Sequence, residues 1–177
     1  AMVSALTMLG LDEMTARYAS YEDLASLIRG RFQEPRATLR ELFGRLVFNI
    51  LCGNTDDHAR NHAAFWDGSS LRLTPAYDIC PQDRSGGEAS QAMKIVGENA
   101  SSRLATCLEA APQFLLSREQ AVAIVAGQVE GVRRHFAAVA QEAGLGEVDA
   151  RRLWRRVVLN PYALEGAPPA VIAAARE

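Results

Sequence analysis

One segment in the first third of the chain constrains the fold more than any other. Apolar residues recur there at steps of three and four, the period of an α-helix with one broad buried face: Leu39, Leu42, Phe43, Leu46, Val47, Ile50 and Leu51. Thr38 and Glu41 have the spacing of a capping box, so the helix is expected to begin at Thr38 and to end at Gly53. Such a wide apolar face needs several other elements packed around it, and a chain of 177 residues is long enough to supply them.

A polar segment with turn-forming residues follows this helix at 53–61. Two short apolar runs come next, at 62–66 and 71–74, and the Asp-Gly pair between them is typical of a β-hairpin. A second tight loop, at 75–81, leaves the hairpin and carries Asp78. Because a hairpin returns the chain to where it started, Asp78 is expected close to the polar segment.

The rest of the chain has mainly helical periodicity. One helix is expected after Ser20, a long one from Ser117 to Gly144, and another over 149–159, with a polar loop at 82–88. The sequence therefore predicts a mainly α fold, a helical bundle with one small β-hairpin next to the loop that follows the central helix.

Charge and composition exclude several classes of protein. Lysine and arginine total 19 and aspartate and glutamate total 21, and a net charge of −2 argues against a dedicated nucleic-acid binder. No apolar run reaches the roughly 18 residues that a membrane span requires, and no signal peptide is evident, so a cytoplasmic protein without membrane partners is expected. Cys52, Cys80 and Cys107 fit no metal-binding spacing and are expected to be reduced thiols.

Three polar residues in the two loops have the spacing of a phosphotransferase site. Asp56 is followed after four residues by Asn61, and Asp78 comes after the hairpin; protein kinases have an Asp, an Asn and a second Asp in this order. One carboxylate is needed beside the acceptor hydroxyl, to orient it and take its proton. An amide oxygen and a second carboxylate suit Mg²⁺, a hard cation that prefers oxygen ligands. The pattern predicts Asp56 as the catalytic residue and Asn61 and Asp78 as the residues that hold Mg²⁺ on ATP.

Two strings of residues around these positions resemble a known family. The string N-T-D-x-H-x-x-N, within 48–61, and the string P-x-Y-D, within 73–79, closely resemble the core motifs of HipA-like kinases, the toxin components of bacterial type II toxin–antitoxin modules. The resemblance implies a protein-kinase-like fold with both motifs in its C-terminal lobe, in which Asp56 resembles the catalytic aspartate and Asn61 and Asp78 resemble the Mg²⁺ ligands. It also implies transfer of the ATP γ-phosphate to a protein serine, in known cases on an aminoacyl-tRNA synthetase, and an antitoxin partner that binds DNA.

The resemblance covers residues 20–160 and one kinase lobe only. Residues 1–19 are interpreted as an N-terminal extension whose first two residues are compatible with a cloning scar, and 161–177 as an Ala/Pro-rich tail. Neither a Gly-rich phosphate loop nor a lysine precedes Asp56, since Lys94 is the only lysine; kinases hold the nucleotide with a lysine upstream of the catalytic loop. The N-terminal lobe is therefore expected in a separate segment, in cis or in trans, and the chain alone is expected to be weakly active or inactive.

The same residues allow other interpretations. Aspartate and asparagine often serve as turn or cap residues without any chemistry, and Asp56 and Asn61 could do so. Asp56, His58 and His62 could form a zinc-hydrolase site, although His62 is expected to begin a strand, where the helical spacing of the two histidines would not bring them together. A decayed kinase lobe could also be a non-catalytic interaction module that binds an antitoxin or a separate N-lobe.

Several neighbouring residues are expected to be structural. Asp57 is expected to face solvent or to cap the loop locally, and His58 to hydrogen-bond within the loop. Cys80 is expected to fill space in the core. Trp66 and Tyr77 are expected to pack the hairpin against the helices.

Overall fold

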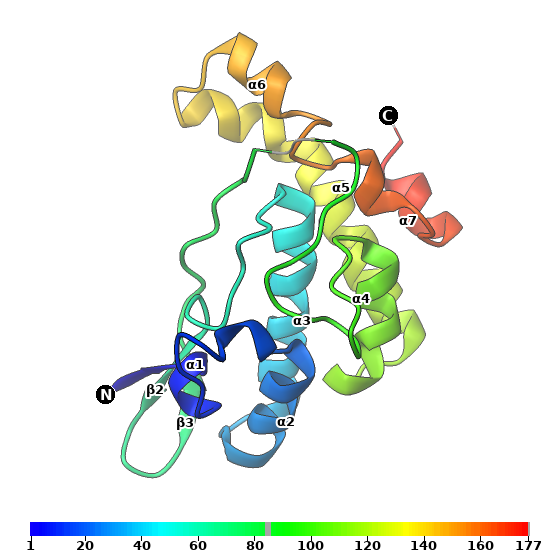
Figure 1. Ribbon diagram of the computed structural model, residues 1–177. Coiled ribbons are helices and arrows are strands. Elements are labelled where there is room, and N and C mark those ends of the chain that lie inside the picture. Colours follow the sequence, from blue (N-terminus) through cyan, green and yellow to red (C-terminus); the bar gives the residue numbers. More distant parts are fainter. Residues whose placement is uncertain (84–85, 177) are drawn as a thin grey trace.

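The computed structural model describes residues 1–83 and 86–176 and has a mainly helical fold with one small sheet (Figure 1). The strands and helices are β1 Met2–Ser4, β2 Ala63–Trp66, β3 Leu71–Leu73, α1 Ala5–Met8, α2 Tyr21–Arg31, α3 Pro35–Cys52, α4 Leu104–Ala110, α5 Arg118–Glu142, α6 Glu147–Leu153 and α7 Pro169–Ala174. Short 3-10 turns lie at Ala16–Tyr18, Ala111–Phe114 and Pro161–Leu164. The predicted mainly α fold with a small hairpin is confirmed. The expected polar loop at 82–88 includes residues 84 and 85, which lie outside the described residues.

Helix α3 forms the centre of the molecule, and its buried face is the one that the apolar pattern predicts. The predicted start at Thr38 is wrong: α3 begins at Pro35, and the Thr38 N–H bonds to the carbonyl of Glu34 inside the helix. Proline suits the first helical position because its φ is already helical and its missing N–H would have no partner there. The helix ends as predicted, with Gly53 as its C-cap at a left-handed φ of 77°.

Helices α2, α4 and α5 pack around α3. Tyr21 at the start of α2 and Phe43 on α3 both approach Phe114, with ring centroids 6.4 Å and 5.3 Å away, respectively. The predicted cap of α5 is confirmed as a capping box, in which Ser117 and Gln120 each accept a hydrogen bond from the other's backbone N–H. The helices therefore share one apolar core with α3 at its centre.

The sheet contains the predicted hairpin and one further strand. Strand β2 pairs antiparallel with β3, and Asp67 closes the turn by accepting bonds of 2.9 Å from the N–H groups of Ser70 and Ser69. These bonds hold the pKa of Asp67 below its usual range. Strand β1 pairs with the other edge of β2. Residues 1–19, interpreted from the sequence as an extension, thus contribute a strand, which at three residues is too short to show an alternating pattern.

The segment after α5 differs from the single helix expected over 149–159. Helix α6 ends at Leu153, and Arg155 and Leu159 adopt left-handed φ angles of 64° and 51°. Leu159 is fully buried, and its N–H donates to the carbonyl of Leu51 near the end of α3 at 2.7 Å. The chain therefore turns back onto α3 instead of continuing the helix.

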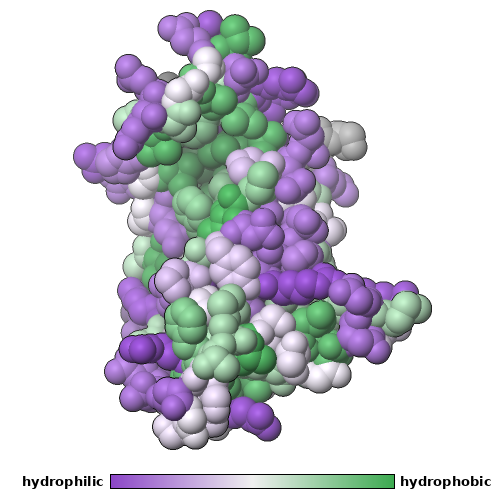
Figure 2. Space-filling view, turned by 90° about the vertical axis from the view of Figure 1, so that its left-hand side faces the viewer, coloured by the Kyte–Doolittle hydropathy of each residue, from purple (hydrophilic) through white to green (hydrophobic). Residues whose placement is uncertain are grey.

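The C-terminal part of the chain packs on α5. Helix α7, in the segment 161–177 expected to be a tail, contacts α5 and has Val171 buried. Helices α5 and α6 border a groove of about 940 Å³ whose lining includes Phe136, Leu145 and Trp154. Hydrophobic residues gather in the upper part of the face shown in Figure 2, toward the α6 end of the molecule. Within residues 1–83 and 86–176, no helix has the length and apolar character needed to cross a membrane.

Candidate functional site

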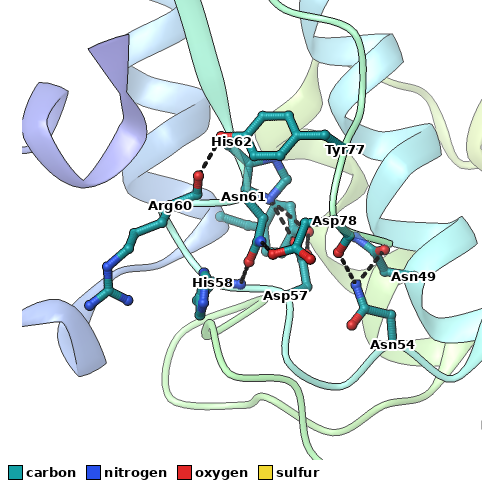
Figure 3. A network of polar contacts seen from close by, with 10 residues as sticks. Asn49, Asn54, Asp57, His58, Arg60, Asn61, His62, Tyr77 and Asp78 are labelled. Atoms are coloured by element: carbon teal, nitrogen blue, oxygen red, sulfur yellow. Dashed lines mark hydrogen bonds and ion pairs between the residues drawn. The ribbon is translucent and has the colours of Figure 1, made fainter. Parts of the chain in front are cut away.

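The loop that carries Asp56 and Asn61 is anchored where it leaves α3. Asn54 Nδ2 donates to Asn49 Oδ1 on α3 at 3.1 Å, and it also donates to the backbone carbonyl oxygen of Asp78 at 3.5 Å (Figure 3). Both Asn49 and Asn54 are buried, so the bond between them forms away from water, where competition from solvent is weakest. The buried amide pair therefore links the start of the loop to the segment that contains Asp78.

Asn61 and Asp78 lie side by side, as the hairpin prediction requires. Asn61 Oδ1 accepts a 2.9 Å bond from the N–H of His58, and the Asn61 N–H donates to the His58 carbonyl at 2.9 Å. The side-chain nitrogen of Asn61 then donates to Asp78 Oδ2 (Figure 3). The structure thus brings into contact the two residues predicted to hold a metal ion, although they are 17 positions apart in the chain.

The segment around Asp78 is held from both sides. Asp78 has a φ of 57°, a left-handed conformation that few non-glycine residues adopt and that aspartate tolerates better than most. The Tyr77 hydroxyl donates to the carbonyl of Arg60 in the preceding loop. Partial burial and the nearby charge of Asp78 raise the pKa of Tyr77, so this hydroxyl keeps its proton and remains a donor. Arg45, buried on α3, donates to the carbonyl of Thr74 at 2.6 Å.

Two neighbouring aspartates in the loop have opposite environments. Asp56 is exposed, and no group in residues 1–83 and 86–176 forms a hydrogen bond or ion pair with its carboxylate. Asp57 is only 1% exposed: it accepts from the Tyr21 hydroxyl, and its Oδ1 lies 3.0 Å from His62 Nε2. The prediction that Asp57 faces solvent or caps the loop is therefore wrong. Burial and the adjacent Asp57 raise the pKa of Tyr21 well above its ordinary value, which keeps Tyr21 a neutral donor.

The zinc-hydrolase alternative does not agree with this arrangement. Asp56 is exposed, whereas His62 is buried against Asp57 and immediately precedes β2. The structure therefore does not bring Asp56, His58 and His62 together as ligands. Among the residues that the structure describes, no group of three or more His, Cys, Asp or Glu side chains is placed to hold a metal ion.

The three cysteines are free and differ in exposure. Cys80 was expected in the core, but it is exposed two residues after Asp78 because the segment that carries it runs over the surface. Cys52 and Cys107 are buried. Burial raises the pKa of Cys52 to about 11 and also raises that of Cys107.

We expect a thiol reagent such as DTNB to label one of the three cysteines rapidly in the native protein at neutral pH. The thiolate is the reactive form, and of the three cysteines only Cys80 is exposed to the reagent. Absorbance of the released thiol measures the reaction, and Cys80→Ser should remove the fast phase while leaving two thiols reactive after unfolding. Rapid native labelling of two or more cysteines would contradict the burial of Cys52 and Cys107.

Fold and site together define a class of helical lobe in which an Asp-x-x-x-x-Asn loop meets a second aspartate loop across a short hairpin. The sequence profile of the HipA-like C-terminal domain matches residues 1–160. This match covers most of the chain, and the protein belongs to the HipA-like C-terminal domain family.

Two curated relatives match a shorter stretch. A Haemophilus influenzae protein named "Putative kinase" is 36% identical over 64 residues, which make up 36% of this chain and 19% of that protein. A Sinorhizobium fredii protein named "Putative kinase Y4mE" is 28% identical over 68 residues, which make up 36% of this chain and 16% of that protein. Each match therefore covers less than a fifth of the relative.

A solved structure shares the fold over nearly the whole chain. It is a chain of the Shewanella oneidensis toxin–antitoxin complex of HipA, HipB and operator DNA, with a TM-score of 0.70 and 19% sequence identity. The match covers 98% of this chain and 42% of the other chain. At this level of identity the likeness shows the fold.

Proposed function

We propose that this chain is the catalytic lobe of a HipA-like serine/threonine protein kinase of the toxin type, which transfers the γ-phosphate of ATP to a serine of a protein substrate. The observation that carries the proposal is the contact between Asn61, in the loop that presents the exposed Asp56, and the exposed Asp78 in the loop that follows the hairpin. Membership of the HipA-like family and the kinase names of the two curated relatives support it.

Asp56 is proposed as the catalytic residue. Phosphoryl transfer needs a carboxylate that orients the acceptor hydroxyl and takes its proton. The Asp56 carboxylate is exposed and makes no bond to the described residues, so both its oxygens are available to a substrate hydroxyl. Its neighbour Asp57 has both oxygens engaged in the core and cannot take this role.

Asn61 and Asp78 are proposed to hold Mg²⁺ together with ATP. Mg²⁺ is usually bound by one or two carboxylates plus substrate phosphates and water, so it does not require a complete protein cage. The exposed carboxylate of Asp78 and the adjacent amide of Asn61 fit this requirement. Because Asn61 donates its N–H to Asp78, metal binding would require the amide to give up this bond and present its oxygen instead. Mg²⁺, when bound, would neutralise negative charge on the transferring phosphate.

Other parts of the active kinase are proposed to come from elsewhere. No lysine precedes Asp56, so we assign the nucleotide-clamping lysine and the phosphate loop to a separate N-terminal lobe, in cis or in trans. By analogy with the HipA, HipB and operator DNA complex that shares the fold, the partner is a DNA-binding antitoxin. An aminoacyl-tRNA synthetase is the proposed class of protein substrate, and the proposed location is the cytoplasm.

We expect Asp78→Ala to abolish or strongly weaken binding of Mg–ATP, because the variant loses the only carboxylate in contact with Asn61 among the described residues. Isothermal titration calorimetry of the 177-residue chain measures the affinity, and a loss of roughly 10-fold or more is expected. Asp149→Ala, an exposed aspartate at the start of α6, is the matched control and should bind as the wild type does.

If the chain alone does not bind Mg–ATP, the N-terminal lobe is added in trans. The titration is then repeated, and a kinase assay is added. Binding that is restored and depends on Asp78 would support the proposal. An assembled protein that binds its antitoxin but neither binds Mg–ATP nor phosphorylates protein would contradict it and favour the non-catalytic interaction module.

A further inference from the structure

A buried polar triad lies on the core side of the loop that carries Asp56. Its members are Tyr21 from α2 and two loop residues, Asp57 and His62, and all three are at most 2% exposed. The Tyr21 hydroxyl donates to Asp57 Oδ2, and His62 Nε2 lies 3.0 Å from Asp57 Oδ1 and 3.5 Å from the Tyr21 oxygen. The proposed function gives none of these three residues a part in binding or chemistry.

Two of the triad residues, Asp57 and His62, have the same spacing as Asp56 and Asn61. Asp57 directly follows Asp56, and His62 directly follows Asn61, so both pairs are five positions apart. The contact between Asp57 and His62 therefore fixes in the core both ends of the stretch that carries the exposed Asp56 and the buried Asn61. Each residue has only two soft backbone torsions. Fixing Asp57 and His62 in the core therefore restricts where Asp56 and Asn61 can point.

The triad is tied to rigid parts of the fold. The Tyr21 ring meets His62 edge-on with centroids 5.6 Å apart, and the Tyr21 N–H donates to the carbonyl of Lys94 at 2.9 Å. The His62 carbonyl accepts from the N–H of Ala5, which follows β1, at 2.7 Å. The loop is thus held at one point by α2 and at another by the first residue of α1.

Burying a carboxylate with two polar partners adds little net stability, because removing these groups from water costs free energy. Apolar residues of similar volume often stabilise a core as well or better, because they avoid the cost of removing charged and polar groups from water. Such a network does, however, impose direction: an acceptor shared by two donors permits far fewer arrangements than apolar contacts do. The three residues are therefore better explained by orientation of the loop than by stability alone.

We propose that Tyr21, Asp57 and His62 are positioning residues that set the separation and direction of Asp56 and Asn61. This inference rests on the proposed function, because it assigns the triad to the same site. The triad residues do not need to contact substrate or metal themselves for this role.

The test is NMR spectroscopy of the full ¹⁵N-labelled chain in four forms: wild type, Tyr21→Phe, Asp57→Asn and the control Tyr18→Phe. Tyr21→Phe removes one hydroxyl and keeps the ring, so it is the variant expected to fold best. Tyr18 is 54% exposed, and its substitution removes the same atom at a site away from the triad. Spectra are recorded where all four forms are folded, first alone and then during titration with Mn²⁺ and ATP.

In both triad variants we expect the side-chain amide signals of Asn61 to shift or broaden. The Mn²⁺ concentration that broadens the signals of Asn61 and Asp78 should rise roughly 10- to 100-fold, as for other residues that orient metal ligands. The Tyr18→Phe spectra and midpoint should match those of the wild type. Triad variants that melt at lower temperature but keep the wild-type Asn61 signals and Mn²⁺ midpoint would overturn the proposal, because the triad would then serve stability only.

Failure of the proposed function gives a different result. If Mn²⁺ with ATP leaves the wild-type signals of Asn61 and Asp78 unchanged, even with the N-terminal lobe supplied, the metal role of these residues is contradicted. The Asn61 signals of the metal-free variants still decide the positioning role: a change supports it, and identity with the wild type overturns it.

Discussion

Asp57→Ala is expected to lower the free energy of unfolding by about 3 kcal/mol. The substitution removes a carboxylate that is 1% exposed and leaves the Tyr21 hydroxyl and His62 Nε2 without their shared acceptor in the core. Water cannot replace that acceptor without opening the packing around Tyr21, which is fully buried. Urea denaturation followed by circular dichroism measures the change.

Asp56→Ala is the matched control for this prediction. It deletes the same chemical group one residue earlier in the chain, where the side chain is exposed and makes no bond to the described residues. The free energy of unfolding should change by no more than about 0.5 kcal/mol. Equal losses for the two variants would contradict the separation into a buried and an exposed aspartate.

Gly53→Ala is the other substitution with a large expected effect, a loss of about 3 kcal/mol. Gly53 has a φ of 77°, and a left-handed conformation costs an ordinary residue roughly 1–2 kcal/mol. An added Cβ would also lie 2.6 Å from Val157 Cγ1 and 2.8 Å from the Val157 carbonyl oxygen. Relieving that overlap would force α3 and the 155–159 turn apart, at a further cost of about 1–3 kcal/mol.

Gly131→Ala separates this local effect from the general effect of adding a methyl group. Gly131 lies inside α5 with helical geometry, and an added Cβ would meet nothing within 4 Å. Alanine should there raise the free energy of unfolding by about 0.5–1 kcal/mol, because it favours the helix more than glycine does. Thermal melts of both variants give the comparison, and destabilisation by Gly131→Ala as large as that by Gly53→Ala would contradict the explanation.

Gly53→Ala should also disturb the candidate site. The Gly53 carbonyl accepts from the Gln82 N–H at 3.0 Å, and the next residue, Asn54, bonds to Asn49 and to Asp78. A shift at Gly53 would therefore be transmitted to both loops. The amide signals of Asn54 in the NMR spectrum are a direct probe of that shift.

Patterns within short stretches of sequence were sufficient to predict the buried face and the C-terminal end of α3, the hairpin and the pairing of Asn61 with Asp78. The buried face of α3 follows from a repeat of three and four residues, and the hairpin follows from one Asp-Gly turn. Because the hairpin returns the chain to where it started, it brings the loop that carries Asn61 next to the loop that carries Asp78. The helix face and the hairpin turn depend on interactions between residues close in sequence, which local patterns record.

Other features depend on partners that are distant in the chain. Nothing local predicts that Asp57 is buried while Asp56 is exposed, because this difference in burial comes from Tyr21, 36 positions away from Asp57. Strand β1 exists because β2 offers it an edge, and residues 155–159 turn back because Leu159 is buried against the end of α3. Helix periodicity and turn chemistry thus specified the scaffold, and the motif spacing specified the candidate metal ligands. The burial of Asp57 and the third strand were decided only when tertiary packing brought distant partners within hydrogen-bonding distance.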